Sequence, residues 1–332
     1  MTGDRNERER RLEDIRTEAE AKGRVAGAGV HAAGGPQPPP PAAGYRGKPV
    51  LKPPVWTWEV GLYFFVGGLA GMAAVIAMVN RLTGGEAGLT RWALTLAAAG
   101  ATVSPVLLVL DLGRPLRFLH MLRVFKWRSA MSVGVWLLLA FGLFAVPAAA
   151  LAWWFPASAG GAPFTGALDR LGTLLAIGAG FTGSLVGTYT GVLLAATVVP
   201  VWLSHRWLLP LHFGLAGLGS AVAALELLGF PSPELNAVGI AVALIETAVG
   251  ARVELRRRPV VDDPLHRGRS GWTLRIAGAL SGPVSLLLRL AGFIPAAAVA
   301  FLAGALVSRY GWLMAGRASA QDPAAVFASQ AQ

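Results

Sequence analysis

The most informative pattern in this sequence is a series of long apolar runs separated by short polar or glycine- and proline-rich breaks. A helix needs about 20 consecutive apolar residues to cross the roughly 30 Å hydrocarbon core of a membrane. Runs close to this length cover residues 57–80, 90–110, 131–155, 171–201, 207–229, 234–253, 273–290 and 294–313. The pattern predicts an all-α integral membrane protein of about eight transmembrane helices, the seventh interrupted by Pro283 and Arg289.

The segments outside these runs have a different composition. Residues 1–25 are densely charged and residues 26–54 are rich in Ala, Gly and Pro. Such segments bury too little apolar surface to offset the entropy lost on ordering. We therefore expect a disordered N-terminal tail over 1–54, a membrane domain over 55–314 and a C-terminal tail over 315–332.

Composition supports this division and excludes several kinds of site. Hydrophobic residues make up 54% of the sequence and charged residues only 14%, against roughly 25% charged in an ordinary soluble domain. The sequence has no cysteine, so it cannot hold a disulfide, a thiolate-bound metal or a cysteine-ligated iron–sulfur cluster. We expect no metal site on it.

The net charge of +11 changes the picture through its distribution. Most basic residues lie between apolar runs, in the loops that eight spans would place on the side of both termini. Cytoplasmic loops of membrane proteins carry this excess, so we expect both termini in the cytoplasm and no binding of nucleic acid. A basic loop that docks an acidic partner protein would give the same pattern.

The loop between the second and third runs carries the first candidate chemistry. Asp111 ends the second run, and Arg114 follows within reach of an ion pair, with Gly113 and Pro115 turning the chain. Cationic or histidine residues then recur at every third position among bulky apolar residues: Arg117, His120, Arg123 and Lys126. A helix lying at the membrane interface accounts for this pattern, although an ordinary basic loop would also produce it.

Several other segments combine with this loop into a resemblance. The first run opens with residues 54–68, PVWTWEVGLYFFVGG; the fourth contains residues 187–194, GTYTGVLL; the last ends with Arg309-Tyr310-Gly311-Trp312. With residues 111–115, these segments resemble the NrfD family, the membrane subunits of polysulfide-reductase-type complexes. The resemblance extends over roughly residues 49–325.

The resemblance implies several properties of the fold and its partners. The eight helices would form two four-helix bundles without a haem or other prosthetic group, and with a pocket for menaquinone or ubiquinone. An iron–sulfur subunit would bind this protein and connect it to a catalytic subunit, often a molybdopterin enzyme. The location would be a bacterial-type inner membrane.

The resemblance also indicates which residues line the quinone pocket. Glu59, Tyr63 and Tyr189 occupy the matching positions, although family members often have Asn or His where Glu59 falls. Glu59, Asp111 and Arg114 would line the mouth of the pocket, with Tyr189 deeper, because the start of span one and the end of span two face the same side. Interfacial packing would equally explain Tyr63, and helix packing Tyr189. The basic residues Arg117, His120, Arg123 and Lys126 would dock the partner.

Two acids lie inside apolar runs. Glu226 is near the far end of the fifth, and Glu246 lies in the sixth, six residues before Arg252. Ionisable residues inside membranes are costly and usually functional, so these three residues form a candidate proton path. A structural interpretation would leave Glu226 solvated at the interface and pair Glu246 with Arg252 or another arginine. Arg289 and Arg309 would then snorkel or form pairs near the ends of their spans.

Three other functions are open to such a sequence. A haem anchor needs two histidines on facing helices, and His212 alone among the histidines falls well inside a run. A secondary transporter should have broken helices in symmetric pairs and a charged site at the midplane, whereas the clearest polar cluster here lies at one membrane edge. A purely structural anchor would tolerate Tyr189→Phe and Glu59→Gln without loss of quinone-linked turnover.

Overall fold

The computed structural model describes residues 50–54, 56–111, 118–155 and 163–330, which belong to one unit running from Pro49 to Gln332. The expected disordered tail therefore lies almost wholly outside the described residues, and so do Arg114 and Arg117. Within the described ranges the secondary structure is helical and no strand occurs.

Long apolar helices confirm a multi-pass membrane protein. Six of the described helices are long and apolar enough to cross a membrane: α2 (Trp58–Leu82), α3 (Ala87–Asp111), α5 (Ala130–Trp154), α6 (Pro163–Ala195), α8 (Leu208–Leu227) and α13 (Ile294–Gln321). Helices also cover the other two expected spans, but they are more polar or interrupted. These are α9 (Pro233–Leu255) and the continuous stretch of α11 (Gly268–Ala279), the π-helical turn η3 (Leu280–Val284) and α12 (Ser285–Leu290).

Short helices connect or follow the long ones. They are α4 (Phe118–Leu122), α7 (Pro200–Ser204), α10 (Asp263–His266) and α14 (Pro323–Gln330).

The structure corrects two expected boundaries and locates the break in the seventh span. The fourth span ends at Ala195 instead of continuing to 201, because Pro200 has no N–H to donate and begins the separate helix α7. The seventh is broken at Gly282, whose φ of −96° and ψ of −105° are not helical. The eighth continues to Gln321, past the expected end at 313, because residues such as Gly316 and Ala320 are still buried.

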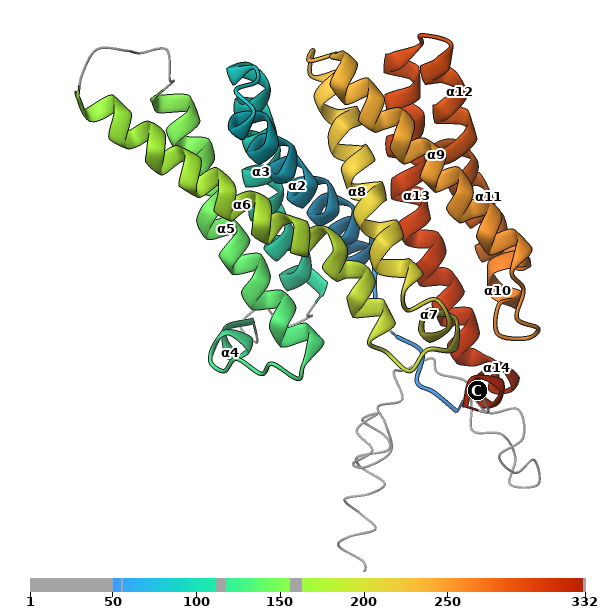
Figure 1. Ribbon diagram of the computed structural model, residues 1–332. Coiled ribbons are helices and arrows are strands. Elements are labelled where there is room, and N and C mark those ends of the chain that lie inside the picture. Colours follow the sequence, from blue (N-terminus) through green and yellow to red (C-terminus); the bar gives the residue numbers. More distant parts are fainter. Residues whose placement is uncertain (1–49, 55, 112–117, 156–162, 331–332) are drawn as a thin grey trace, which may run out of the picture. The chain divides into compact units, whose positions relative to one another are not determined.

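The long helices pack in two neighbouring groups (Figure 1). In the first, α2 packs against α3 and α6, while α5 packs against the same two helices. In the second, α8 packs against α9 and α13, and α11 and α12 lie along α13. Helix α2 also contacts α8 and α13, so it is shared by both groups.

Glycines explain how α2 approaches its neighbours so closely. A Cβ on Gly71 would overlap the backbone of Gly183 in α6, and a Cβ on Gly217 in α8 would overlap the backbone of Gly68. Small residues at such crossings let helix backbones touch directly, which is how helices associate in lipid. These contacts fix α2 against α6 and α8.

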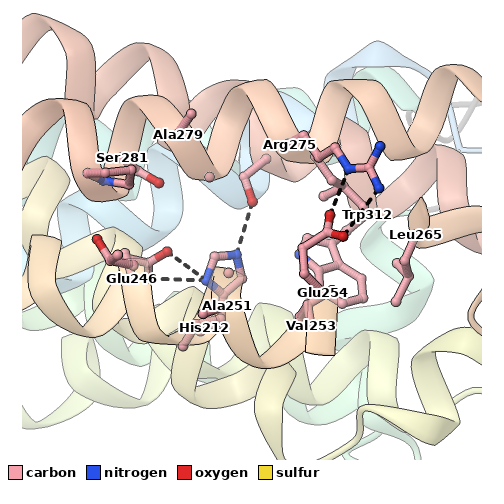
Figure 2. Close-up of a pocket in the computed structure, with 17 residues that line it drawn as sticks. His212, Glu246, Ala251, Val253, Glu254, Leu265, Arg275, Ala279, Ser281 and Trp312 are labelled. Carbon is pink, nitrogen blue, oxygen red and sulfur yellow. Dashed lines mark hydrogen bonds and ion pairs between the residues drawn. The ribbon is translucent and has the colours of Figure 1, made fainter. Parts of the chain in front are cut away.

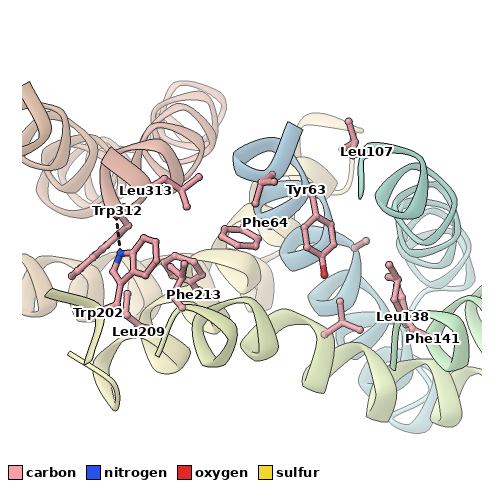
Figure 3. Close-up of a cluster of buried hydrophobic side chains, with 14 of the residues drawn as sticks. Tyr63, Phe64, Leu107, Leu138, Phe141, Trp202, Leu209, Phe213, Trp312 and Leu313 are labelled. Atoms are coloured by element: carbon pink, nitrogen blue, oxygen red, sulfur yellow. Dashed lines mark hydrogen bonds between the residues drawn. The ribbon is translucent and has the colours of Figure 1, made fainter. Parts of the chain in front are cut away.

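Aromatic side chains fill the space where the two groups meet (Figure 3). Phe64 of α2 packs against Phe213 of α8, with ring centroids 6.0 Å apart. The fully buried Trp202 of α7 donates its indole N–H to the carbonyl of Trp312 at 2.9 Å. This bond joins α7 to α13.

Candidate functional site

A small cavity of about 80 Å³ lies among α2, α3, α5 and α6 and contains three of the residues that the sequence suggested. Tyr63, Asp111 and Tyr189 line it together with apolar side chains and a glycine: Leu108, Phe118, Met131, Gly134, Val135 and Leu193. The structure therefore brings together residues that are as far as 126 positions apart in the sequence. Glu59 is not in the lining, and Arg114 is outside the described residues.

Tyr189 is held in place by α5. Its hydroxyl donates a hydrogen bond to the carbonyl of Ala130 in the first turn of that helix. Its ring lies where a Cβ of residue 134 would stand, so glycine is required there. The side chain is 8% exposed, and this small exposed part faces the cavity.

The hydroxyl of Tyr63 is available to hydrogen-bond a ligand in the cavity. Its side chain is 3% exposed and packs beside Phe64 (Figure 3). Among the residues that the structure describes, its hydroxyl has no hydrogen-bond partner, although it borders the cavity. A buried phenol normally finds a partner. A molecule bound in the cavity could supply one.

A threonine links the two carboxylates that were expected at the mouth. The Thr57 N–H donates to Asp111 Oδ1 at 3.2 Å, and Thr57 Oγ1 lies 2.7 Å from the same oxygen. Thr57 Oγ1 is also in hydrogen-bonding contact with Glu59 Oε2. A hydroxyl carries one hydrogen, so Thr57 can donate to only one of the two carboxylates at a time. Glu59 thus connects to the cavity through Thr57 and Asp111.

The basic segment after the cavity is less helical than expected. Helix α4 ends at Leu122, and residues 123–129 are not helical, with a bend at Arg123 and a turn at Trp127 and Arg128. His120, Arg123 and Lys126 are exposed, and so are apolar neighbours such as Trp127, which is 70% exposed. An interfacial helix continuing to Lys126 was therefore wrong in extent, but the mixture of exposed cations and large apolar side chains is present.

A larger cavity of about 360 Å³ lies in the second helix group, between α8, α9, α11, η3 and α13 (Figure 2). Its polar part is a row of three buried side chains. His212 Nδ1 lies 3.0–3.1 Å from the two carboxylate oxygens of Glu246, and His212 Nε2 lies 3.0 Å from Ser308 Oγ. At another part of the lining, Arg275 and Glu254 form a more exposed ion pair at 2.7 Å.

The second intramembrane acid, Glu226, is part of a closed ion pair. Arg289 donates to its two oxygens at 2.7 and 2.8 Å and also to Asn236 Oδ1 at 3.1 Å. Both charged side chains are almost completely buried. A Cβ on Gly239 would overlap the guanidinium group, so this glycine makes room for the pair. Glu226 is therefore not solvated at an interface.

The arginines outside this pair also depart from expectation. Arg252 does not pair with Glu246; it lies in a surface groove beside Trp207. Arg309, instead of snorkelling, is fully buried, with its guanidinium carbon 3.8 Å from the centre of the Phe213 ring. Its NH2 donates to the Phe213 carbonyl at 2.9 Å.

Sequence reasoning missed the roles of His212 and Ser308 and left the partner of Arg289 unnamed. The pair of Glu226 and Arg289 could have been predicted from the sequence. Both residues lie near the C-terminal ends of their apolar runs, and opposite charges inside lipid usually pair. No comparable signal identifies Ser308, since serine occurs throughout these helices. The described residues contain no group of histidines and acids arranged to hold a metal ion.

Comparison with known proteins decides the family. A family model described as polysulphide reductase, NrfD, matches residues 49–233, more than half of the sequence. The chain belongs to the NrfD family. It is also 28% identical over 204 residues to the C subunit of polysulfide reductase from Wolinella succinogenes. That alignment covers 53% of this protein and 58% of the relative.

The family match covers the residues of the two cavities to different extents. The matched residues include Tyr63, Asp111 and Tyr189. They include His212 and Glu226, but the partners Glu246, Arg289 and Ser308 lie beyond residue 233. The family match therefore includes all three polar residues of the Tyr63–Tyr189 cavity and only part of the His212–Glu246 cavity.

Proposed function

We propose that this protein is the quinone- or quinol-reactive membrane subunit of a multi-subunit oxidoreductase, with its reaction site at the Tyr63–Tyr189 cavity. The observation that carries the proposal is the hydroxyl of Tyr63, without a partner among the described residues, in a cavity that Tyr189 and Asp111 also line. The cavity is small, so a quinone would insert only the edge of its ring between the tyrosines.

The chemistry needs a route for protons as well as for electrons. Oxidation of a quinol to a quinone releases two electrons and two protons. A phenol and a carboxylate in a dry pocket suit the hydrogen bonds and proton transfers at the ring oxygens. Tyr63 would bond one ring oxygen, and protons would leave through Asp111, Thr57 and Glu59, which are in hydrogen-bonding contact in that order. The electrons would pass to an iron–sulfur partner subunit and from it to a catalytic subunit.

The proposal includes a topology. Eight spans in two four-helix bundles would place both termini in the cytoplasm of a bacterial-type cell, with the exposed His120, Arg123 and Lys126 on the partner's side. The alternating pattern of basic loops supports this orientation.

The first test is mild purification of the tagged protein, followed by mass spectrometry of bound subunits and extraction of bound quinone. An iron–sulfur protein with stoichiometric quinone is the expected result. A folded protein that carries neither and moves a solute into vesicles would replace the proposal with a transporter. Quinone-free complexes with full turnover through another membrane subunit would reduce this protein to a structural anchor.

Gly134→Ala should slow quinol oxidation by the purified complex. The added methyl group would push the Tyr189 ring from its position, and a displacement of about 1 Å at a reaction site can cost on the order of 10²-fold in rate. Gly142→Ala is the matched control on the same helix, because its Cβ would meet only Ala101 at 3.9 Å. Equal rates for the two variants would remove the reaction from this cavity.

We also assign proton transfer through the second helix group to Glu246 and His212. An imidazole bonded to a carboxylate on one side and a hydroxyl on the other can accept and release a proton. In proteoliposomes containing the whole complex, Glu246→Gln should preserve quinol oxidation and abolish the coupled pH change reported by a trapped dye. Glu234→Gln, an exposed glutamate on the same helix, is the control. An unchanged proton yield per electron in Glu246→Gln would refute the assignment.

A further inference from the structure

A surface feature of another kind lies at one end of α8 and α9, on the other side of Val249 from the 360 Å³ cavity. It is a polar hollow that adjoins an apolar groove, with Trp207 lining both. Trp207 is 82% exposed and stands at the start of α8. Tryptophan is enriched at this depth of membrane proteins, where the head groups of lipids begin.

The polar hollow is basic. It has a volume of about 330 Å³ and is lined by Arg206, Arg258 and residues that include Ser204, Trp207 and Ser329. Arg258 NH1 donates to Ser204 Oγ at 3.2 Å, which holds that arginine at the wall. The guanidinium of Arg206 lies 5.6 Å from the Trp207 ring centre and has no acidic partner among the described residues.

The groove next to it is apolar except at one position. It has a volume of about 390 Å³ and runs between α8 and α9, lined by Leu208, Leu211, Ile245, Ala248 and Val249. Arg252 is the charged residue in this lining and, like Arg206, has no acidic partner in the described ranges. A groove of this composition on the outer side of two membrane helices suits hydrocarbon chains.

The acids near this site are already engaged. Asp262 accepts bonds from His205 at 3.1 Å and from the Arg258 N–H at 2.8 Å. Burial alone would raise the pKa of Asp262, but these bonds outweigh it and hold the pKa below its usual value. Glu254 is paired with Arg275. Within the described part of the protein, the positive charge of Arg206 and Arg252 is therefore not cancelled locally.

We propose that this surface binds an anionic phospholipid, with the phosphate at Arg206, Arg252 and Arg258 and an acyl chain in the α8–α9 groove. The charge, the Trp207 ring and the adjoining apolar groove match the three parts of such a lipid: phosphate, glycerol region and hydrocarbon tail. Basic pockets between membrane helices bind acidic lipid head groups for the same reasons. The site does not depend on whether the Tyr63–Tyr189 cavity reacts with quinone.

The test measures lipid retention by the whole complex. Nanodiscs containing equal amounts of phosphatidylglycerol and phosphatidylcholine are prepared, and lipids that remain bound after extraction are counted by native mass spectrometry. Wild-type protein should keep phosphatidylglycerol selectively. The double variant Arg206→Gln/Arg252→Gln should bind it roughly 30-fold more weakly, since each arginine near an anionic lipid contributes about 1 kcal/mol and 1.4 kcal/mol is tenfold.

Matched charge removal keeps the test specific. Arg267→Gln/Arg269→Gln deletes the same charge from exposed positions at the start of α11 and should leave retention unchanged. An equal loss in both double variants, or no preference for phosphatidylglycerol, would overturn the site. Competition by soluble glycerol phosphate as strong as by the lipid would indicate a phosphate site instead. Loss of a partner subunit from Arg206→Gln/Arg252→Gln alone would assign the surface to protein docking.

Discussion

Arg289→Met will destabilise the protein by about 3–5 kcal/mol, the usual cost of removing one partner from a buried ion pair. The variant leaves Glu226 inside the second helix group without the two bonds that it now accepts at 2.7 and 2.8 Å. Methionine keeps the apolar stem of the side chain but lacks the guanidinium group, so the variant loses both the charge and the packing of that group against Gly239. The free energy of unfolding in mixed micelles, measured by titration with SDS, reports the effect.

A double variant separates charge from packing. Glu226→Gln/Arg289→Met has no buried charge at this position, so it should recover most of the lost stability. Arg81→Met is a useful comparison, because Arg81 pairs with Asp169 in a partly exposed bond and exposed pairs contribute only about 0–1 kcal/mol. If Arg289→Met costs no more than Arg81→Met, the Glu226 pair is solvated in the membrane and the buried geometry is wrong.

Tyr63→Phe will reduce kcat for quinol oxidation by about 10²-fold or more, the usual size of a general acid–base contribution. The variant deletes the hydroxyl that borders the cavity and leaves the ring packing beside Phe64 intact. The assay uses the purified complex with a soluble quinol and a dye acceptor. In the same variant, the part of the pH dependence of kcat that comes from proton transfer in the cavity should disappear.

Tyr310→Phe is the control for the loss of a phenol. Its hydroxyl donates to the Trp58 carbonyl at 2.9 Å and does not line the cavity, so turnover should stay near wild type. Wild-type kcat in Tyr63→Phe, with a normal KM, would mean that Tyr63 only packs. A rise in KM alone would mean that it binds quinol without taking part in proton transfer.

The apolar runs predicted the helices well because every residue of a segment in lipid must suit an apolar surrounding. A segment in hydrocarbon must satisfy its backbone internally, so length and hydropathy suffice to locate α2, α3, α5 and α8. Boundaries failed where tertiary contacts decide them. Helix α13 continues past residue 313 because Trp202, distant in sequence, covers Gly316, and no local pattern contains that contact.

The sequence predicted the candidate site only in part, for the same reason. Tyr63, Asp111 and Tyr189 were placed together from motif positions and helix directions, and the structure brings all three to one cavity. The link from Glu59 to Asp111 through Thr57 depends on side-chain geometry, which the sequence does not contain. The partners of Glu226 and Glu246 come from α12 and α8, and a single sequence does not indicate which distant helices become neighbours.

The glycine crossings of α2 determine how a lipid-soluble molecule reaches Tyr63. Backbones that touch directly at Gly71–Gly183 and Gly68–Gly217 cannot part without losing the whole contact, so entry between α2 and α6 or between α2 and α8 is closed. Leu108, Phe118 and Met131 line the cavity on the side of α3, α4 and α5, and Met131 is half exposed. Methionine changes rotamer easily. A flat ring would therefore slide in sideways from the bilayer past α4 and the start of α5, next to the surface expected to dock the electron-accepting partner.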